Sequence, residues 1–324
     1  MGASLLGHPC RRWLWLSFRW AVREHFTGRM LRLFDRGQRE EAVIVENLRR
    51  IGIIIHHTSA DDGGQLFVKL APHVGGSLDG IIESGVPGAE KTRHVAEFKT
   101  HNLKNFNELK AKGVFEAKRR HWCQMQCYMH GTGIKRALYV AVCKDNDELY
   151  TERVEYNPKA AEDIIRRGAE IVLTERMPEP LSADPAWYVC KMCPAWTFCH
   201  QTHQIEADCV NCRTCAHVTP KEDGTWVCEN AEHFFGGAIE KDSGLSCLAV
   251  QSEQDQRDGC SRHALHPDLV PWKCAGADEF NNAVYKIDGK QVINGGGTNV
   301  YDAVLSVNLL NGEREPRPDS GVPF

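Results

Sequence analysis

Two strand-like segments in the middle of the chain constrain its fold most strongly. HVAEFKT (94–100) is largely apolar and alternates, and RALYVAVCK (136–144) is apolar almost throughout. Their composition predicts strands, with a helix between them around 118–131. A further strand is predicted at 149–157 and an amphipathic helix at 159–177. The resulting order predicts an α/β fold with a mixed central β-sheet flanked by helices.

The segments that precede this core are predicted from the same patterns. Residues 11–50 are predicted to be helical, with a plausible stop at Gly52. The segment 64–84 alternates and is interrupted by Gly75 and Gly76, which indicates two short strands.

Length and charge limit the classes of protein that need to be considered. A chain of 324 residues with 42% hydrophobic residues suggests one large domain and a smaller one. The net charge of −4 excludes a globally basic nucleic-acid-binding protein, so a basic surface has to be local, as at 9–23 and 110–122. Arginines interrupt every apolar run near the start, and none is long enough to span a membrane. We therefore expect a cytoplasmic protein that is neither secreted nor membrane-bound.

An acid and a base share one face of the strand HVAEFKT. Alternation places Glu97 and Lys99 on one face and Ala96 and Phe98 on the other. Such a pair is commonly a structural salt bridge, and Asp79 in GGSLDGII is commonly a turn residue. Together, Asp79, Glu97 and the backbone carbonyl of Phe98 would supply the oxygen ligands that Mg²⁺ or Mn²⁺ prefers. Lys99 would then orient or deprotonate a water, or stabilise a phosphate.

This arrangement resembles the PD-(D/E)XK nuclease superfamily, whose signature is an aspartate followed after a variable gap by acid-x-lysine on a neighbouring strand. Gln124 and Tyr128 in HWCQMQCYMHG lie one helical turn apart and match the Q-x-x-x-Y motif of the RecB-like branch. That branch often carries a histidine or glutamate near the metal on an early helix. Here the candidate is Glu41, with Gln38 and Glu40 as rival positions.

Ten of the 14 cysteines lie between Cys190 and Cys274, which favours metal binding in a chain without an export signal. The resemblance extends to iron–sulfur RecB-like nucleases, including CRISPR-adaptation and AddB-type enzymes, where one cysteine precedes the nuclease core and three follow it. It implies a [4Fe–4S] cluster that ties the first helix to the end of the core. Zinc is the alternative metal. The implied ligands are Cys10, Cys190, Cys193 and Cys199.

A second cysteine group indicates a structural zinc site. The preferred ligands are Cys212, Cys215, Cys228 and Cys260, with His263 and Cys209 as alternates. This module could bind DNA, dock a partner or simply cap the fold. We therefore predict a nuclease core at 1–204 closed by the iron–sulfur staple, a zinc module at 205–275, and a β-hairpin with a disordered tail at 276–324.

These features and the resemblance imply a metal-dependent DNA exonuclease, with Asp79, Glu97, Lys99, Gln124 and Tyr128 at its site. It would process DNA ends in recombination, repair or phage replication, alongside a recombination or single-strand-annealing partner. An endonuclease and a non-catalytic DNA-binding scaffold are the alternatives. The residues predicted to contact DNA are Lys104, Lys110, Lys112, Lys118, Arg119, Arg120 and Trp122.

Overall fold

A computed structural model describes residues 1–59, 63–228, 256–257, 263–271, 274–277, 283–287 and 290–294. The chain forms two compact units, one built from residues 1–8 and 25–170 and the other from 9–24 and 171–324. The first unit contains Asp79, Glu97, Lys99, Gln124 and Tyr128. The second contains most of the cysteines.

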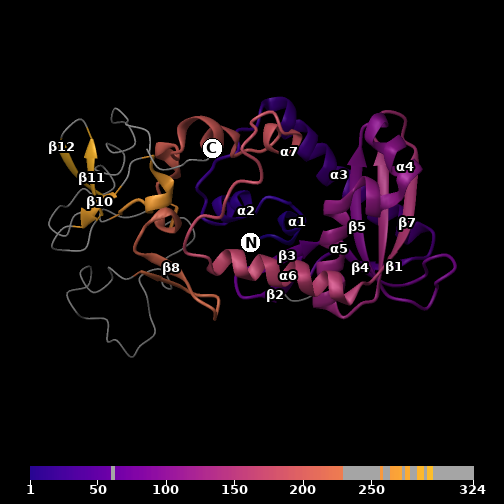
Figure 1. Ribbon diagram of the computed structural model, residues 1–324. Coiled ribbons are helices and arrows are strands. Elements are labelled where there is room, and N and C mark those ends of the chain that lie inside the picture. Colours follow the sequence, from indigo (N-terminus) through magenta and orange to yellow (C-terminus); the bar gives the residue numbers. More distant parts are fainter. Residues whose placement is uncertain are drawn as a thin grey trace. The chain divides into compact units, whose positions relative to one another are not determined.

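A five-stranded mixed sheet forms the centre of the first unit (Figure 1). Its strand order is β1 (Ile54–His56), β4 (Gly80–Ser84), β5 (His94–His101), β6 (Arg136–Cys143) and β7 (Leu149–Glu155). The pair β5–β6 is parallel and the other pairs are antiparallel. The predicted mixed α/β sheet is therefore confirmed.

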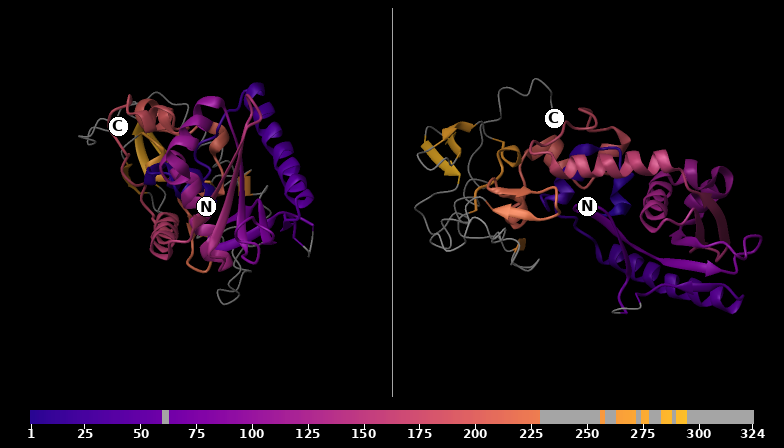
Figure 2. Two further views of the ribbon diagram at one scale, coloured as in Figure 1. Left: turned by 90° about the vertical axis from the view of Figure 1, so that its right-hand side faces the viewer. Right: turned by 90° about the horizontal axis from the view of Figure 1, so that it is seen from below.

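Helices cover both faces of this sheet, and β5 and β6 are largely buried. On one face α3 (Gly28–Arg50) contributes Ile44 and Val45 to a core that contains Phe98 and Val140. The left-hand view of Figure 2 shows α3 running along the side of the sheet. On the other face lie α4 (Leu103–Ala117) and α5 (Arg119–Thr132). The residues of β5 that alternate with Phe98, including Glu97 and Lys99, point to this second face.

A small hairpin and two further helices complete the first unit. The hairpin pairs β2 (Leu66–Ala71) with β3 (Val74–Leu78) and packs on α5. The short α1 (Ala3–Leu6) lies against α5 and β3. The helix α6 (Pro158–Leu173) begins in this unit, where Arg167 donates hydrogen bonds to the carbonyls of Leu6 and His8.

Three sequence-based predictions of the elements need correction. The region 11–50 is two helices, α2 (Arg11–Phe18) and α3, because Trp20 takes a positive φ of 55° that ends the first helix. Residues 64–84 form three strands, since Gly75 and Gly76 lie inside β3 and the turn occurs at His73. The helix α4 was not predicted; Gly113 interrupts it at φ 73°.

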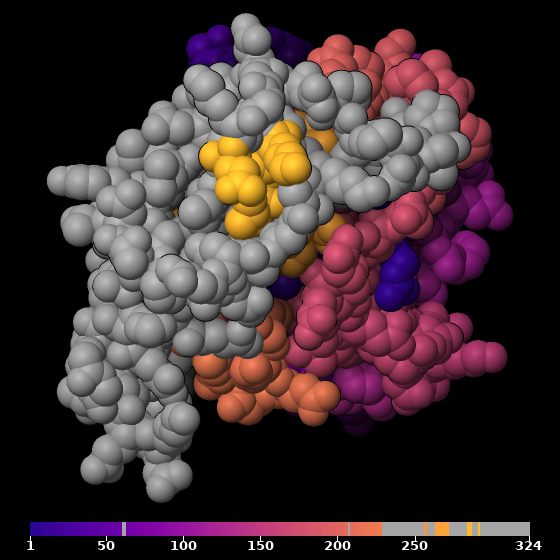
Figure 3. Space-filling model, turned by 60° about the vertical axis from the view of Figure 1, so that its left-hand side comes forward, coloured from indigo at the N-terminus to yellow at the C-terminus, as the bar shows by residue number. Residues whose placement is uncertain are grey.

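The second unit is built from short elements. It contains α2, α7 (Tyr188–Lys191), η1 (Phe198–Thr202), the turns η2 (Ala207–Cys209), η3 (Cys212–Thr214) and η4 (Pro267–Leu269), and the hairpin β8 (Val218–Pro220)–β9 (Trp226–Cys228). The surface of this hairpin is visible in Figure 3, in orange. Trp15 of α2 is fully buried and donates a hydrogen bond from Nε1 to the carbonyl of Thr174 at 2.8 Å.

The C-terminal strands are β10 (Cys274–Ala277), β11 (Ala283–Ile287) and β12 (Lys290–Asn294), which form an antiparallel sheet. The predicted hairpin corresponds to the antiparallel pair β11–β12, while the predicted disordered tail lies outside the described residues. In the part of the chain that the structure describes, no helix has both the length and the apolar character needed to cross a membrane.

The packing of the hairpin on α5 gives a test of the fold. A methyl group added to Gly131 would lie 2.5 Å from Val68 Cγ2 and 2.8 Å from Leu70 Cδ2. Gly131→Ala should therefore lower the free energy of unfolding by about 1–3 kcal/mol, although alanine is the better helix former. The matched control is Gly37→Ala in α3, where nothing lies within 4 Å. It should raise that free energy by roughly 0.5–1 kcal/mol in urea titrations.

Candidate active site

The acid cluster is built where β3 passes into β4 beside β5. Asp79 occupies the single position between β3 and β4. Its Oδ2 accepts a hydrogen bond of 2.7 Å from the backbone N–H of Phe98. This bond holds the aspartate against the strand that carries Glu97 and Lys99, as their order in the sequence predicts.

Three oxygen atoms converge on the ammonium group of Lys99. Nζ lies 2.5 Å from Glu97 Oε1, 2.9 Å from the carbonyl oxygen of Phe98 and 3.5 Å from Asp79 Oδ2. These are the same three groups that the sequence proposes as ligands of a divalent metal. The ammonium group therefore lies where two carboxylates and a carbonyl can share one cation.

Glu97 is the most deeply buried member of the cluster. Its side chain has an exposed fraction of 0%, and neither carboxylate oxygen accepts a hydrogen bond of good geometry. Burial raises the pKa of Glu97, Lys99 opposes this shift, and Asp79 adds to it. Burial alone would lower the pKa of Lys99, but Glu97 and Asp79 outweigh it and raise the pKa. The site thus has an excess of buried negative charge and keeps Lys99 protonated.

Glu41 of α3 interacts electrostatically with two members of this cluster. Burial raises the pKa of this half-buried residue, the charge of Asp79 raises it further, and Lys99 lowers it. Of the rival positions, Gln38 is exposed and Glu40 is partly exposed. Glu41 thus interacts with Asp79 and Lys99 through its charge, although no three His, Cys, Asp or Glu side chains among the described residues are arranged to hold one metal ion.

Gln124 and Tyr128 lie beneath the site instead of facing an open surface. Their exposed fractions are 7% and 2%. Tyr128 Oη donates a 2.6 Å hydrogen bond to the carbonyl of Ser77 in β3, and Gln124 Nε2 donates to Tyr128 Oη at 3.3 Å. A side chain at Gly76 would meet Tyr128 Oη at 2.8 Å, so β3 needs a glycine here. The pair thus holds β3, the strand that ends one residue before Asp79.

A buried polar cluster beside Lys99 was missed at the sequence level. Tyr139 Oη lies 2.9 Å from both His101 Nε2 and His121 Nδ1. A phenol has one proton, so Tyr139 donates to one imidazole and accepts from the other. Burial lowers the pKa of His101 to about 4 and of His121 to about 3, with Lys99 contributing to both. Strand alternation in the sequence could have indicated this cluster, because His101 lies on the same face of the strand as Glu97 and Lys99.

These imidazoles make stability depend on pH. The pKa of His121 is about 3 in the folded chain and about 6.5 when unfolded, so the unfolded state binds the proton first as the pH falls. The contribution of His121 to the free energy of unfolding is complete above pH ~6.5. It decreases by about 1.4 kcal/mol per pH unit below that pH. His121→Asn should show a smaller loss of stability than wild type between pH 7 and pH 5 in urea titrations. Equal losses would show that His121 does not titrate as its burial requires.

The Tyr128 hydrogen bond can be tested separately. Tyr128→Phe leaves the Ser77 carbonyl without this partner and should lower the free energy of unfolding by roughly 1–3 kcal/mol. Tyr188→Phe is the control, because Tyr188 is 71% exposed and its change should be near zero. Equal effects in urea titrations would contradict the supporting role of Tyr128.

Some of the residues proposed to contact DNA already interact with other residues of the protein, and others are exposed. Lys110 pairs with Glu148, Lys112 lies 3.0 Å from Glu108 and Lys118 donates to Asn105 at 3.0 Å. Lys104 and Arg120 are exposed. The guanidinium of Arg119 lies 4.0 Å from the ring centroid of Phe115 and 4.4 Å from that of Trp122. Trp122 is 7% exposed, so its indole is already packed and is not open for stacking on a base.

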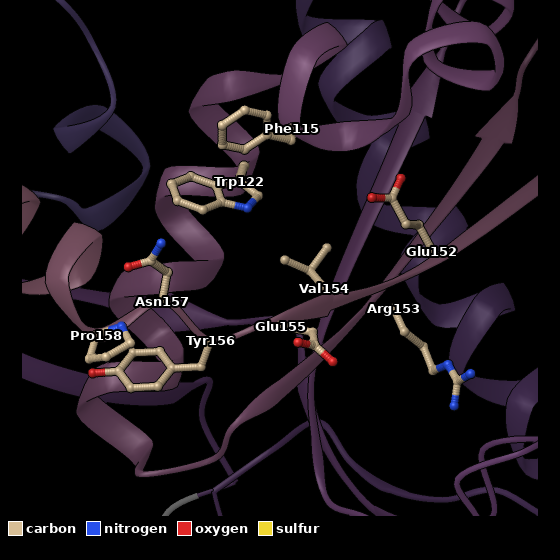
Figure 4. A pocket seen from close by; sticks show the side chains of 9 residues that line it. All are labelled: Phe115, Trp122, Glu152, Arg153, Val154, Glu155, Tyr156, Asn157 and Pro158. Carbon is tan, nitrogen blue, oxygen red and sulfur yellow. The ribbon is translucent and has the colours of Figure 1, made fainter.

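Trp122 instead lines a hollow at the β7 edge of the sheet. The hollow has a volume of about 570 Å³, and its other lining residues include Phe115, Val154 and Tyr156. Figure 4 shows Phe115 and Trp122 on one side and the β7 residues on the other. None of its lining residues belongs to the acid cluster, so this hollow is separate from the convergent oxygens.

The four proposed cluster cysteines all belong to the second unit. Cys10 caps α2 and accepts a hydrogen bond from the N–H of Trp13, Cys190 lies in α7 and Cys199 in η1. Burial raises the pKa of each thiol that follows the core, and the charge of Cys10 raises it further. The charge of Cys10 thus acts on all three later thiols, and their grouping as ligands of one cluster stays a prediction. Their thiols are chemically suited to iron or zinc.

The proposed zinc residues are only partly described. Cys212 lies in η3, Cys215 follows it and Cys228 ends β9, while Cys260 lies outside the described residues. Nε2 of the alternate His263 lies 2.9 Å from the carbonyl oxygen of Asn211, and the alternate Cys209 lies beside Asp208. Within the described ranges, no three His, Cys, Asp or Glu side chains are arranged to hold a single metal ion. The predicted cysteine-rich module held together by metal ions is therefore not seen in this structure.

Comparison with known proteins gives matches to solved structures only. No family model and no curated protein matches the chain. An alkaline exonuclease from Laribacter hongkongensis is similar at 16% identity over 53% of this chain and 84% of that chain, with a TM-score of 0.35. The same enzyme in complex with dAMP gives 17% identity over 46% and 69%, with a TM-score of 0.33. The protein SSO0001 gives 16% identity over 50% and 68%, with a TM-score of 0.33.

Proposed function

We propose that this chain is a metal-dependent deoxyribonuclease that hydrolyses phosphodiester bonds at DNA ends during recombination, repair or phage replication. The observation that carries the proposal is the convergence of Asp79, Glu97 and the Phe98 carbonyl on one cationic group. Glu97 supports it further, because a fully buried carboxylate without good hydrogen bonds is costly unless a cation offsets its charge. A structural salt bridge alone does not account for the second carboxylate or for Glu41.

Asp79, Glu97, Glu41 and the Phe98 carbonyl would hold Mg²⁺ or Mn²⁺, because all four are hard oxygen donors. A bound divalent cation activates water for attack on phosphorus and offsets charge on the phosphate. Lys99 keeps its proton beside the two carboxylates and donates hydrogen bonds to a phosphate oxygen as negative charge develops there. Tyr128 and Gln124 keep Asp79 in position through β3.

End-labelled DNA with Mg²⁺ or Mn²⁺ tests the activity, its polarity and its strand preference together. Wild type should release labelled products, and chelation should abolish release. Glu97→Gln and Lys99→Met should each lower the rate by at least about 100-fold, because each removes charge from the reacting centre. Glu116→Gln and Lys159→Met are matched controls on exposed helix positions and should cleave like wild type.

Loss of folding has to be separated from loss of chemistry, since Lys99→Met leaves Glu97 buried without its partner. The double variant Glu97→Gln with Lys99→Met removes both charges and should remain folded and inactive. Equal cleavage by wild type and Lys99→Met would overturn the assignment. Binding of DNA without any cleavage would favour a non-catalytic scaffold, and cleavage of closed circular DNA would identify an endonuclease.

We further propose that Cys10, Cys190, Cys193 and Cys199 hold a [4Fe–4S] cluster, and that Cys212, Cys215 and Cys228 hold zinc with Cys260. The electrostatic effect of Cys10 on the three later thiols supports the first assignment. Protein purified without oxygen should contain iron and sulfide and be brown, and Cys193→Ser should lose this iron but keep zinc. Stoichiometric zinc that Cys193→Ser removes would overturn the cluster in favour of zinc.

A further inference from the structure

The two outer strands of the central sheet differ in length and regularity. β1 forms one edge with only three residues, and its pairing with β4 shifts register between Ile54 and Ile55. β7 forms the other edge with seven residues and pairs with β6 without a shift in register. A short or irregular edge strand is a poor template for a further strand, whereas a long regular one is a good template. The edge of β7 is therefore the one suited to accept another strand.

The register of β7 shows which of its backbone groups face outward. The N–H of Tyr156 donates to the carbonyl of Lys135 at 3.2 Å, on the side of β6. Hydrogen-bonded positions alternate in an antiparallel pair, so the even-numbered residues of β7 pair with β6. The N–H and C=O groups of Thr151 and Arg153 therefore point away from the sheet. No hydrogen bond joins these outward groups to another described residue.

Gln126 of α5 satisfies the same edge where β7 ends. Its Nε2 donates to the carbonyl of Glu155 at 2.9 Å, and its Oε1 accepts from the N–H of Asn157 at 2.7 Å. These two bonds are of the kind that a neighbouring strand would make with its own backbone. The stretch of β7 that remains to be paired thus runs from Thr151 to the N–H of Glu155.

The hollow described above lies along this edge. Residues 152–158 line it from the strand, and Phe115 and Trp122 line it from the helices. In Figure 4, Val154 points toward Trp122 and Arg153 points away from it, as alternation requires. Phe115 is 48% exposed, so this wall can be reached by an incoming side chain. A strand added to β7 would place its alternate side chains beside these two aromatic rings.

Three cations surround the hollow without a carboxylate partner. The guanidinium of Arg119 lies 4.0 Å from the ring centroid of Phe115, and Nζ of Lys135 lies 4.2 Å from that of Tyr156. Arg153 donates to a backbone carbonyl at 3.1 Å. Within the part of the chain that the structure describes, no carboxylate lies within 4.0 Å of any of the three.

The acids of the same region already have partners. Glu152 accepts hydrogen bonds from the N–H of Val114 at 2.8 Å and from Tyr150 Oη at 2.5 Å. Glu155 pairs with Arg136 at 3.2 Å. The charge that remains at the edge of β7 is therefore positive, and it is complementary to a segment with acidic side chains. It disfavours a second copy of this chain, whose identical cations would face the first.

We propose that the edge of β7 binds an extended acidic segment of a partner protein, which adds a sixth strand to the sheet. The backbone of this segment pairs with Thr151, with Arg153 and with the N–H of Glu155. One of its apolar side chains enters the hollow, and its acidic side chains lie beside the three cations. The inference is independent of the proposed nuclease function, because none of these residues belongs to the acid cluster.

Three synthetic peptides test the chemistry of the partner. The probe is fluorescein-labelled acetyl-Glu-Val-Glu-Phe-Glu-Val-Glu-amide, and its binding to the full chain is measured by fluorescence anisotropy. The same peptide with lysine in place of glutamate should bind at least about tenfold more weakly. N-methylation of one alternate set of its amides should weaken binding at least about fivefold, whereas methylation of the other set should not, because a strand pairs through one edge only.

Variants of β7 test the backbone pairing. Thr151→Pro removes an outward N–H without removing a bond to β6, and it should weaken binding of the acidic peptide at least about fivefold. Thr151→Val is the matched control, because it keeps the N–H and should bind like wild type. Arg153→Glu should weaken binding of the acidic peptide and strengthen binding of the lysine peptide.

The hollow and the position of the added strand have separate readouts. Phe115→Ala should weaken binding, whereas Phe67→Ala on β2, where Phe67 is 68% exposed, should not. Amide hydrogen exchange measured by NMR should slow at Thr151 and Arg153 when the acidic peptide is added. Exchange at Asn157 should stay unchanged, since its N–H is already bonded to Gln126.

Selective binding of the acidic peptide, with protection at Thr151 and Arg153, supports the proposal. Failure of this peptide to bind overturns it, as does equal binding of the lysine peptide or equal effects of the two methylation patterns. Unchanged binding by folded Thr151→Pro overturns the strand pairing. A wild-type dimer in sedimentation velocity that Thr151→Pro converts to a monomer would assign the edge to a second copy and overturn the acidic partner.

Discussion

Burial of the Glu97 carboxylate is the constraint on which the rest of the first unit depends. Removing a carboxylate from water costs several kcal/mol unless a partner compensates it, and here the compensation comes from Lys99 two residues along the same strand. Lys99 can serve two acids only because Asp79 is held to β5 by the N–H of Phe98. The junction of β3 and β4 is fixed in turn by Tyr128, which reaches from α5 to the carbonyl of Ser77.

The two faces of β5 have different tasks. Ala96 and Phe98 pack with Ile44 and Val45 of α3 in an apolar core, while Glu97, Lys99 and His101 point the other way. The helix α3 therefore has three roles along its length. Its second half covers the core, Glu41 interacts electrostatically with Asp79 and Lys99, and its first half leaves apolar side chains exposed. A helix whose only task was to cover the sheet would not expose these side chains.

Much of the core could be predicted because its signals are local. The strands that contain Glu97 and Tyr139, and the helix that contains Tyr128, form where apolar runs and periodicity predict them. The failures have equally local causes. Gly113 interrupts the helical pattern of α4, and Gly75 and Gly76 resemble a turn although they lie within β3, where β2 and Tyr128 approach too closely for a side chain. Trp20 ends α2 with a backbone conformation that its residue type does not indicate.

The sequence by itself determined the alternation that puts Glu97 and Lys99 on one face, the order of the elements around them and the spacing of the late cysteines. The sequence also contains the arginines and aromatic residues of α3. It predicts one continuous helix there, whereas the structure has α2 and α3. Only the tertiary structure decided which side chains these residues meet, because Asp79, Glu41 and the His101–Tyr139–His121 cluster come from separate elements. Burial likewise assigned Tyr128 to holding β3 and Trp122 to packing, since exposure is a property of the folded neighbours and not of the residue.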